Sequence, residues 1–151
     1  MMRDMELMNA VFLAATVGVG PFWILMALRP RATITNRLMR TPWPVIGIGL
    51  IYASLVLPNV GAILETLLNP TLSAISTSLG TPEGSLAVWL HVLAFDLLAG
   101  RFIWLDGLAR GVGAPLRIAA LTLALMFGPI GLLLHLALRP RVVQDPAQPV
   151  S

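Results

Sequence analysis

The chain has 151 residues, of which 57% are hydrophobic and only 11% are charged, and its mean hydropathy is +0.85. Soluble globular domains contain about a quarter charged residues, so this composition excludes that class. The ten basic residues are all arginine, and a net charge of +3 is too small and too dispersed for a nucleic-acid-binding surface. Cysteine is absent, which excludes disulfides and thiolate chemistry. The composition predicts an integral membrane protein.

Four apolar segments, each long enough to cross a bilayer, are separated by short polar connections. Each holds roughly 22 to 25 residues, which at about 1.5 Å per residue spans a hydrocarbon core of about 30 Å. None shows the strict alternation of a strand, and open sheet edges are unstable in lipid. We therefore expect an all-α bundle of four transmembrane helices in one domain, residues 1–140, followed by a flexible tail at 141–151. The expected spans are 5–28, 43–67, 86–108 and 115–138.

Arginine counts in the connections predict the orientation, because cytoplasmic loops of membrane proteins are enriched in positive residues. With four spans, the first and third connections share one side of the membrane. That side carries Arg29, Arg31, Arg37, Arg40, Arg110 and Arg117, and the other side carries Arg3, Arg139 and Arg141. We therefore expect a multi-pass protein of the inner (cytoplasmic) membrane with both termini outside.

Small residues and prolines inside the spans indicate how the helices pack. Small side chains recur every four positions at 10, 14 and 18 in the first span and at 120, 124 and 128 in the fourth. Such stripes let helix backbones approach closely, either within the chain or between copies of it in a homo-oligomer. Pro21, Pro58 and Pro129 each remove a backbone donor and bend a helix. These bends either serve packing alone or open a cavity among the first, third and fourth helices.

Ionisable side chains inside a membrane span are costly, and they usually face a bundle interior or a cavity. With four straight spans, Glu65, His91 and His135 would lie within about 10 Å of the outer boundary, in one shallow layer. Asp96 lies near mid-membrane, and Arg101 lies about 7.5 Å further along the same helix. Steps of five residues turn a helix by about 140°, so His91, Asp96 and Arg101 do not share one narrow face.

Three interpretations of these polar residues stay open on the residues alone. In the first, the histidines are solvated at the interface, and Asp96 and Arg101 join helices to one another. In the second, His91 and His135 ligate a haem iron or a metal ion, without the support of a Glu-x-x-His or His-x-x-x-His pair. In the third, which needs no cofactor, Asp96 and His91 perform acid–base chemistry on a lipophilic substrate while Arg101 stabilises charge.

Three segments carry a resemblance to a known family. They are PFWILM at 21–26, WLHVLAFDLLAGRFI at 89–103 and GPIGLL at 128–133. In this order and spacing, the chain resembles the abscisic-acid-deficient-four-like family of small four-helix membrane proteins, whose plant members are required to make neoxanthin from violaxanthin in plastids. The likeness extends from about Asn9 to Arg139, and W-x-H-x-x-x-x-D-L-x-x-G-R-aromatic is its most specific pattern.

The resemblance implies a carotenoid or related isoprenoid as the ligand and a bacterial-type member of the family. It implies catalytic roles for His91, Asp96 and Arg101, because opening an epoxide to an allene needs one proton donated to oxygen and one removed from carbon. The residues expected to line the cavity or shape its opening are Pro21, Trp23, Glu65, Trp89, Pro129 and His135. We therefore expect an isomerase-like or lyase-like step on a carotenoid. The alternatives are a non-catalytic carotenoid-binding or assembly factor and the bis-histidine haem or metal protein.

Overall fold

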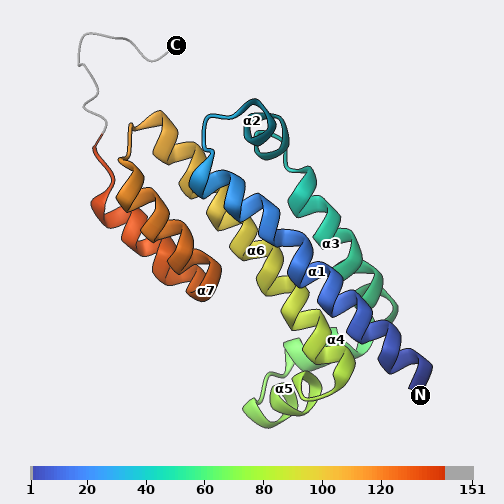
Figure 1. Cartoon of the computed structure of the whole chain (residues 1–151). Coiled ribbons are helices and arrows are strands. Elements are labelled where there is room, and N and C mark those ends of the chain that lie inside the picture. The colour runs from blue at the N-terminus through green and yellow to red at the C-terminus, as the bar shows by residue number, and fades with distance from the viewer. Residues whose placement is uncertain (1, 142–151) are drawn as a thin grey trace, which may run out of the picture.

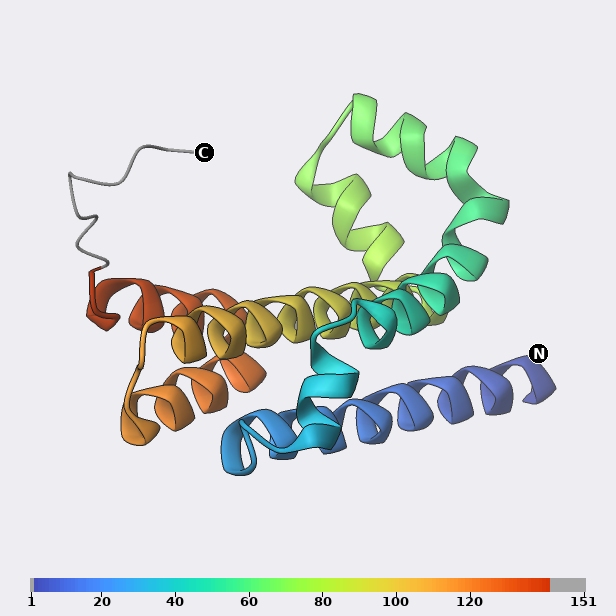
Figure 2. The same ribbon diagram turned by 90° about the horizontal axis from the view of Figure 1, so that it is seen from above.

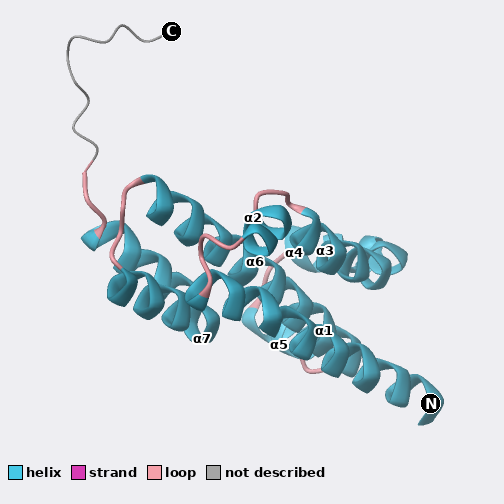
Figure 3. Ribbon diagram, turned by 45° about the horizontal axis from the view of Figure 1, so that its top comes forward, coloured by secondary structure: helices cyan, strands magenta, loops and turns pink. Residues whose placement is uncertain are grey.

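The computed structural model describes residues 2–141. Apart from Arg141, the expected tail at 141–151 therefore lies outside the described residues. Helices joined by short loops make up this part of the chain (Figure 1, Figure 3). They are α1 (Met2–Leu28), α2 (Thr33–Met39), α3 (Trp43–Val56), the 3₁₀ turn η1 (Leu57–Asn59), α4 (Val60–Leu68), α5 (Leu72–Leu79), α6 (Pro82–Ala109) and α7 (Ala114–Leu138). The all-α prediction is confirmed. Four helices are long and apolar enough to cross a membrane, namely Met2–Leu28, Trp43–Leu68, Pro82–Ala109 and Ala114–Leu138.

Helix α6 is the axis of the fold, and α1, α3 and α7 pack along it (Figure 1). The Thr81 hydroxyl caps its start by accepting a hydrogen bond from the Gly84 N–H at 3.0 Å, and Pro82 occupies its first position. The helix ends before Gly111, whose φ of 65° favours glycine. Its buried residues recur at three- and four-residue spacing: Leu86, Leu90, Leu93, Ala94, Leu97, Gly100, Ile103, Trp104 and Gly107.

Two tryptophans fix α1 and the connection after it to α6. A Cβ atom at Gly100 would lie 2.6 Å from the Trp23 ring, so only glycine leaves room for the indole. Trp104 is fully buried, and its indole N–H donates to the Pro30 carbonyl at 2.9 Å. The small-residue stripe predicted to pack the first span takes no part in these contacts. Positions 10, 14 and 18 are exposed, so this stripe does not pack the first span within the chain, and packing between copies stays a prediction.

The second predicted span is interrupted at Pro58. There α3 ends at Val56, η1 follows, and α4 completes the segment, because proline lacks the N–H that a continuous helix needs. Neither α4 nor α5 contains a buried residue, and both extend away from α1 (Figure 2). Pro21, in contrast, lies within α1 without such a break.

The fourth apolar segment folds back on itself. Phe127 has φ −146° and ψ 54°, which are not helical values, and it separates two helical halves of α7 at 114–126 and 128–138. A Cβ atom at Gly131 would collide with the backbone of Ala120 and Ala124, residues that would lie far from it in a straight helix. Figures 1 and 2 show the two halves side by side as a hairpin. Pro129, at the start of the second half, favours this break because its ring cannot follow a continuous turn.

The fold-back brings both ends of α7 to the end of α6. At about 1.5 Å per residue, the halves measure roughly 20 and 16 Å, each shorter than the hydrocarbon core of about 30 Å. Arg139 forms an ion pair with Asp106, and the Pro140 carbonyl accepts a hydrogen bond from Arg110. As folded, the second half of α7 therefore returns toward the side from which the first half starts.

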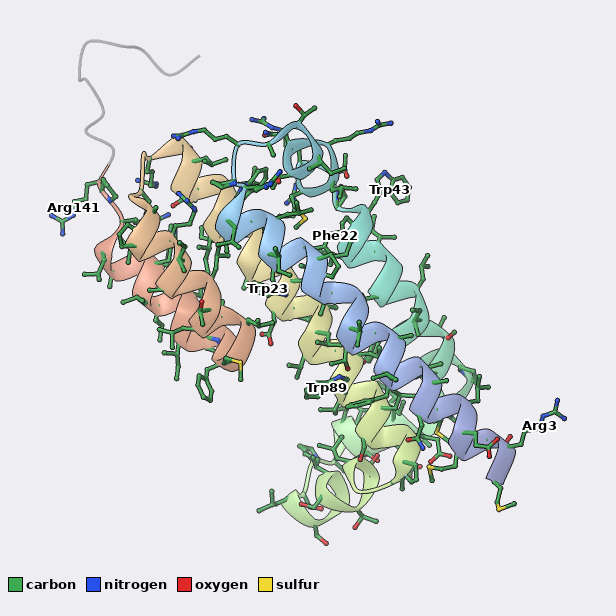
Figure 4. The ribbon with its side chains drawn as sticks, in the orientation of Figure 1. Arg3, Phe22, Trp23, Trp43, Trp89 and Arg141 are labelled. Atoms are coloured by element: carbon green, nitrogen blue, oxygen red, sulfur yellow. The ribbon has the colours of Figure 1, made fainter. Side chains whose placement is uncertain are left out.

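This geometry places the two ends of residues 2–141 at opposite ends of the molecule, whereas the sequence predicted both termini on one side of the membrane. The start of α1 lies beside the start of α6, where the rings of Phe12 and Trp89 are 5.3 Å apart. Arg139 instead lies beside Asp106, near the other end of the 28-residue α6. Figure 4 accordingly places Arg3 and Arg141 at opposite ends of the molecule. The arginine count assumed four straight spans, and the hairpin in α7 removes that assumption.

Replacing Gly131 by valine is expected to destabilise the protein, because a side chain there would collide with the backbone of the facing half of α7. Overpacking of this kind costs about 1–3 kcal/mol of unfolding free energy. Gly18→Val is the matched control, since nothing lies within 4 Å of a Cβ atom at that position. Thermal unfolding in detergent should give a lower midpoint for Gly131→Val than for Gly18→Val. Equal midpoints would contradict the tight contact between the halves.

Candidate functional site

An apolar groove runs along the outer face of α6 where the second half of α7 packs against it. Its volume is about 490 Å³, and it is open to the side of the molecule rather than enclosed. It is lined by Phe95, Leu98, Ala99, Arg101, Phe102, Leu105, Leu132 and Leu136. An adjoining hollow of about 570 Å³ shares Phe102 and Leu105 with it and adds the polar side chains of Arg40 and Asp106. The groove thus joins a long apolar surface to a charged end.

Asp96 follows Phe95 on α6, just beyond the side chains that line the groove. Its carboxylate packs directly against Gly128, at the start of the second half of α7, where a Cβ atom would collide with it. Gly128, Leu132 and Leu136 are four residues apart, so they share the face that borders the groove. Within residues 2–141 the Asp96 carboxylate makes no hydrogen bond or ion pair. Asp96 is therefore a half-buried acid at the tip of a hairpin, free to meet a ligand.

His91 lies one helical turn before Phe95 and stacks on its ring, with 4.6 Å between the ring centroids. Its other aromatic neighbour is Tyr52 of α3, at 5.6 Å. The imidazole is exposed. It lies on the same face of α6 as the groove, further toward the start of the helix than Asp96. No contact joins His91 to Asp96 among the described residues, as the five-residue spacing predicted.

Arg101 serves a different purpose from the predicted one. Its Nε donates to the Met39 carbonyl at 2.7 Å, and its terminal nitrogen donates to the Arg40 carbonyl at 2.8 Å. These carbonyls end α2, where a cation satisfies the free acceptors of a helix C-terminus. Arg101 thus anchors the first connection to α6. Of the three residues assigned to catalysis by the resemblance, Arg101 lines the groove but is bound to these carbonyls, and Asp96 lies next to the groove without a hydrogen bond or ion pair within residues 2–141.

The residues predicted to line a cavity are scattered over the fold. Trp23 is packed on Gly100, and the Trp89 indole donates to the Thr16 hydroxyl at 2.8 Å, so both join α1 to α6 (Figure 4). Pro21, Pro129 and Glu65 are exposed, and Glu65 lies on α4, away from the groove. Among these positions, Pro129 directly follows Gly128, the residue at the tip of the α7 hairpin that the Asp96 carboxylate contacts.

His135 is fully buried at the other end of α6 from His91, so the expected shallow layer with Glu65 and His91 does not form. Its Nε2 lies 2.8 Å from Asp106 Oδ2, fifteen residues along α6 from His91. That spacing corresponds to about 22 Å of helix. A metal ion needs ligands at about 2 Å, so His91 and His135 of one chain cannot share one. The bis-histidine hypothesis assumed that α7 crosses the membrane once, which would bring His135 to the same side as His91. The hairpin in α7 instead takes His135 to the other end of α6.

Sequence reasoning missed the cluster around Asp106. Arg110 Nε lies 2.8 Å from Asp106 Oδ1, and an Arg139 nitrogen lies 2.9 Å from the same oxygen. His135 approaches the second oxygen, and its Nδ1 is buried without a partner among residues 2–141. The i,i+4 spacing of Asp106 and Arg110 was a visible signal. His135 and Arg139 could join it only because α7 returns to this end.

Asp106→Asn is expected to destabilise the protein, because it removes the shared acceptor of two guanidinium groups and a buried imidazole. The loss of unfolding free energy should lie near the low end of the roughly 3–5 kcal/mol found for fully buried pairs, since Asp106 is partly exposed. Glu6→Gln, which alters an exposed carboxylate of α1, is the control. Thermal unfolding of both variants in detergent checks this. An Asp106→Asn protein as stable as the control would mean that the cluster does not hold α7 in place.

Comparison with known proteins gives a consistent family match. The family model described as ABA DEFICIENT 4-like matches residues 10–135. The chain is 30% identical over 138 residues to Protein ABA DEFICIENT 4, chloroplastic, of Arabidopsis thaliana, and the alignment covers 86% of this chain and 60% of that protein. The chain therefore spans about three fifths of that relative's length. No solved structure matches it significantly. Since the family match covers most of the chain, the protein belongs to the ABA DEFICIENT 4-like family.

Proposed function

We propose that this membrane protein binds a carotenoid or related isoprenoid in the groove between α6 and the second half of α7, and that Asp96 performs acid–base chemistry on it. The observation that carries the proposal is an apolar, laterally open groove whose lining stops at Phe95, next to the Asp96 carboxylate, which makes no hydrogen bond or ion pair within residues 2–141. Family membership and the resemblance in 89–103 supply the class of ligand.

The groove suits a long apolar molecule that arrives from the bilayer. Large hydrophobic side chains on this face of α6 are exposed, and they include Phe95 at 59% and Phe102 at 41%. An exposed apolar surface of this kind is stable in contact with lipid chains, and it would be equally stable in contact with a polyene. From Val88 to Ala109 the face rises about 32 Å, close to the thickness of the hydrocarbon core. A ligand lying here would span the membrane with Asp96 beside its chain.

One carboxyl group suffices for the chemistry expected of the family. Protonated Asp96 would donate its proton to an epoxide oxygen, and the resulting carboxylate would remove a proton from carbon as the allene forms. The carboxyl group is then restored, and the reaction is an isomerisation that consumes no oxidant or reductant. His91 stacks on Phe95 and makes no contact with Asp96 among the described residues, so the step is assigned to Asp96 alone, and Arg101 is engaged with α2.

The second candidate is a carotenoid-binding or assembly role without catalysis. It is favoured by the engagement of Arg101 with backbone carbonyls, which leaves one carboxylate next to the groove instead of a set of catalytic groups. In that case Asp96 would bind a hydroxyl or epoxide of the ligand through a hydrogen bond. The two candidates differ in whether pigment is converted or only retained.

Asp96→Asn should abolish conversion, because an amide cannot donate and accept the proton in turn. The full chain is co-expressed in bacteria that make β-carotene, zeaxanthin or violaxanthin, and the extracts are separated by chromatography. A new pigment formed by the wild type should fall by about a hundredfold or more in Asp96→Asn.

Glu65→Gln is the matched control for this experiment, since it neutralises an exposed carboxylate outside the groove. Membrane levels of each variant are measured in parallel. A new pigment that persists in Asp96→Asn would contradict the assigned role. Unchanged pigments in every strain, with carotenoid retained on the purified wild type, would favour the binding role.

We also propose that the arginine-rich end faces the cytoplasm, which places the start of α1 outside and Arg141 inside. Counted on the structure, every arginine except Arg3 belongs to this end: Arg29, Arg31, Arg37, Arg40, Arg101, Arg110, Arg117, Arg139 and Arg141. The acidic residues of the opposite end are Asp4, Glu6, Glu65 and Glu83. The hairpin in α7 moves the last two arginines to this end, and the positive-inside rule then favours one orientation strongly.

Single cysteines introduced into this cysteine-free chain test that orientation. Ser73→Cys on α5, Thr33→Cys on α2 and Pro140→Cys after α7 are all at exposed positions. In spheroplasts, a membrane-impermeant maleimide should label Ser73→Cys at once, and the other two only after the membrane is permeabilised. Labelling of Pro140→Cys together with Ser73→Cys in intact spheroplasts would mean that α7 crosses the membrane.

A further inference from the structure

Arg117 is a buried cation without a counterion in the described part of the chain. Its side chain lies in the second turn of α7 and is 8% exposed, and its Nε is buried without a hydrogen-bond partner. A guanidinium in this state is costly, because a charge removed from water is stable only when it is paired. The unpaired Nε therefore points to a partner that comes from outside the chain.

A second arginine increases this cost. Arg31, in the connection after α1, lies close enough to Arg117 for the two positive charges to repel each other. The one acidic side chain described at this end, Asp106, is occupied by Arg110, His135 and Arg139. Two neighbouring guanidiniums with no acid between them form a receptor for a multivalent oxyanion such as a phosphate.

The start of α7 adds further donors for an anion. Gly113 precedes the helix and supplies no side-chain cap, so the N–H groups of Ala114 and Leu116 have no partner within the helix. Helical side chains lean toward the N-terminus, which directs Arg117 to these groups. The partial positive charge of the helix start favours an anion at the same place.

An apolar groove lies between α1 and the first half of α7, and its lining stops short of the two arginines. Its volume is about 250 Å³, and its lining residues are Trp23, Ile24, Ala27, Leu28, Ile118, Leu121, Thr122 and Leu125. Arg117 stands one turn before Leu121, and Arg31 follows Leu28 by three residues, so both lie at one end of the groove. Ile24 and Leu125 are exposed, so this groove is open to the surrounding lipid.

We infer that Arg31 and Arg117 hold the phosphate of an anionic phospholipid whose acyl chain lies in the groove between α1 and the first half of α7. A bilayer lipid fits because the groove is apolar, open to the side and headed by cations. The same end carries all the arginines but one, which suits the anionic surface of a cytoplasmic leaflet. This site is separate from the groove that contains Asp96.

Native mass spectrometry of the full chain in detergent tests the inference. The protein is titrated with dioleoylphosphatidylglycerol and, in parallel, with dioleoylphosphatidylcholine. The wild type should retain phosphatidylglycerol preferentially, and Arg117→Gln and Arg31→Gln should each weaken its binding about tenfold or more. Arg37→Gln is the matched control, because it removes the same charge from an exposed position on α2 at the same end.

A further variant and two competing ligands identify the source of the phosphate and show whether a loss of binding comes from misfolding. Thr122→Phe fills the groove without changing charge and should also weaken phosphatidylglycerol binding, whether or not Arg117→Gln folds. Inorganic phosphate at the lipid's concentration should not displace the lipid. An equal loss in Arg37→Gln would overturn the site in favour of diffuse surface charge. Displacement of phosphatidylglycerol by equimolar geranylgeranyl diphosphate would overturn the phospholipid assignment in favour of a prenyl diphosphate.

Discussion

The contact between the two halves of α7 is the constraint on which the rest of the structure depends. Gly131 lies directly on the backbone of Ala120 and Ala124, and Phe127 supplies the non-helical residue that reverses the chain. In lipid no hydrophobic force drives helices together, so close backbone packing of small residues must do so. A side chain at Gly131 would separate the halves and expose backbone groups at the tip, where no water satisfies them.

Both grooves and the charged cluster follow from that hairpin. Its first half packs near α1 and borders one groove, and its second half lies along α6 and borders the other, whose lining stops at Phe95, next to Asp96. The returning end carries His135 and Arg139 to Asp106. One acid thereby holds the end of α6 and the end of α7 together, at the level where the chain leaves the apolar region.

The two grooves differ in the chemistry at their ends. The lining of one stops next to an acid that lies deep along α6, and the lining of the other stops next to two arginines at the arginine-rich end. A carboxylate at depth is costly and suits a ligand with a polar atom partway along an apolar chain. Cations near the surface suit a ligand with an anionic head. The two proposed sites would thus select for different lipophilic molecules.

The sequence by itself determined the class of the protein, the limits of its apolar helices and its family. Those features depend on composition, on run length and on local residue patterns such as the motif at 89–103, all of which can be read along the chain. It also determined that His91, Asp96 and Arg101 point in different directions, because the helical turn fixes that angle. The C-terminal carbonyls that Arg101 satisfies belong to a short helix that hydropathy does not reveal.

Only the tertiary structure decided where the fourth apolar segment goes. A run of 25 apolar residues is compatible with a straight span and with a hairpin, because both bury the same side chains in lipid. The choice depends on whether Gly131 can lie against Ala120 and Ala124, which is a contact in space that spacing does not specify. That contact separated His135 from His91 and brought His135 and Arg139 to Asp106, a pairing across the fold that no local pattern predicts.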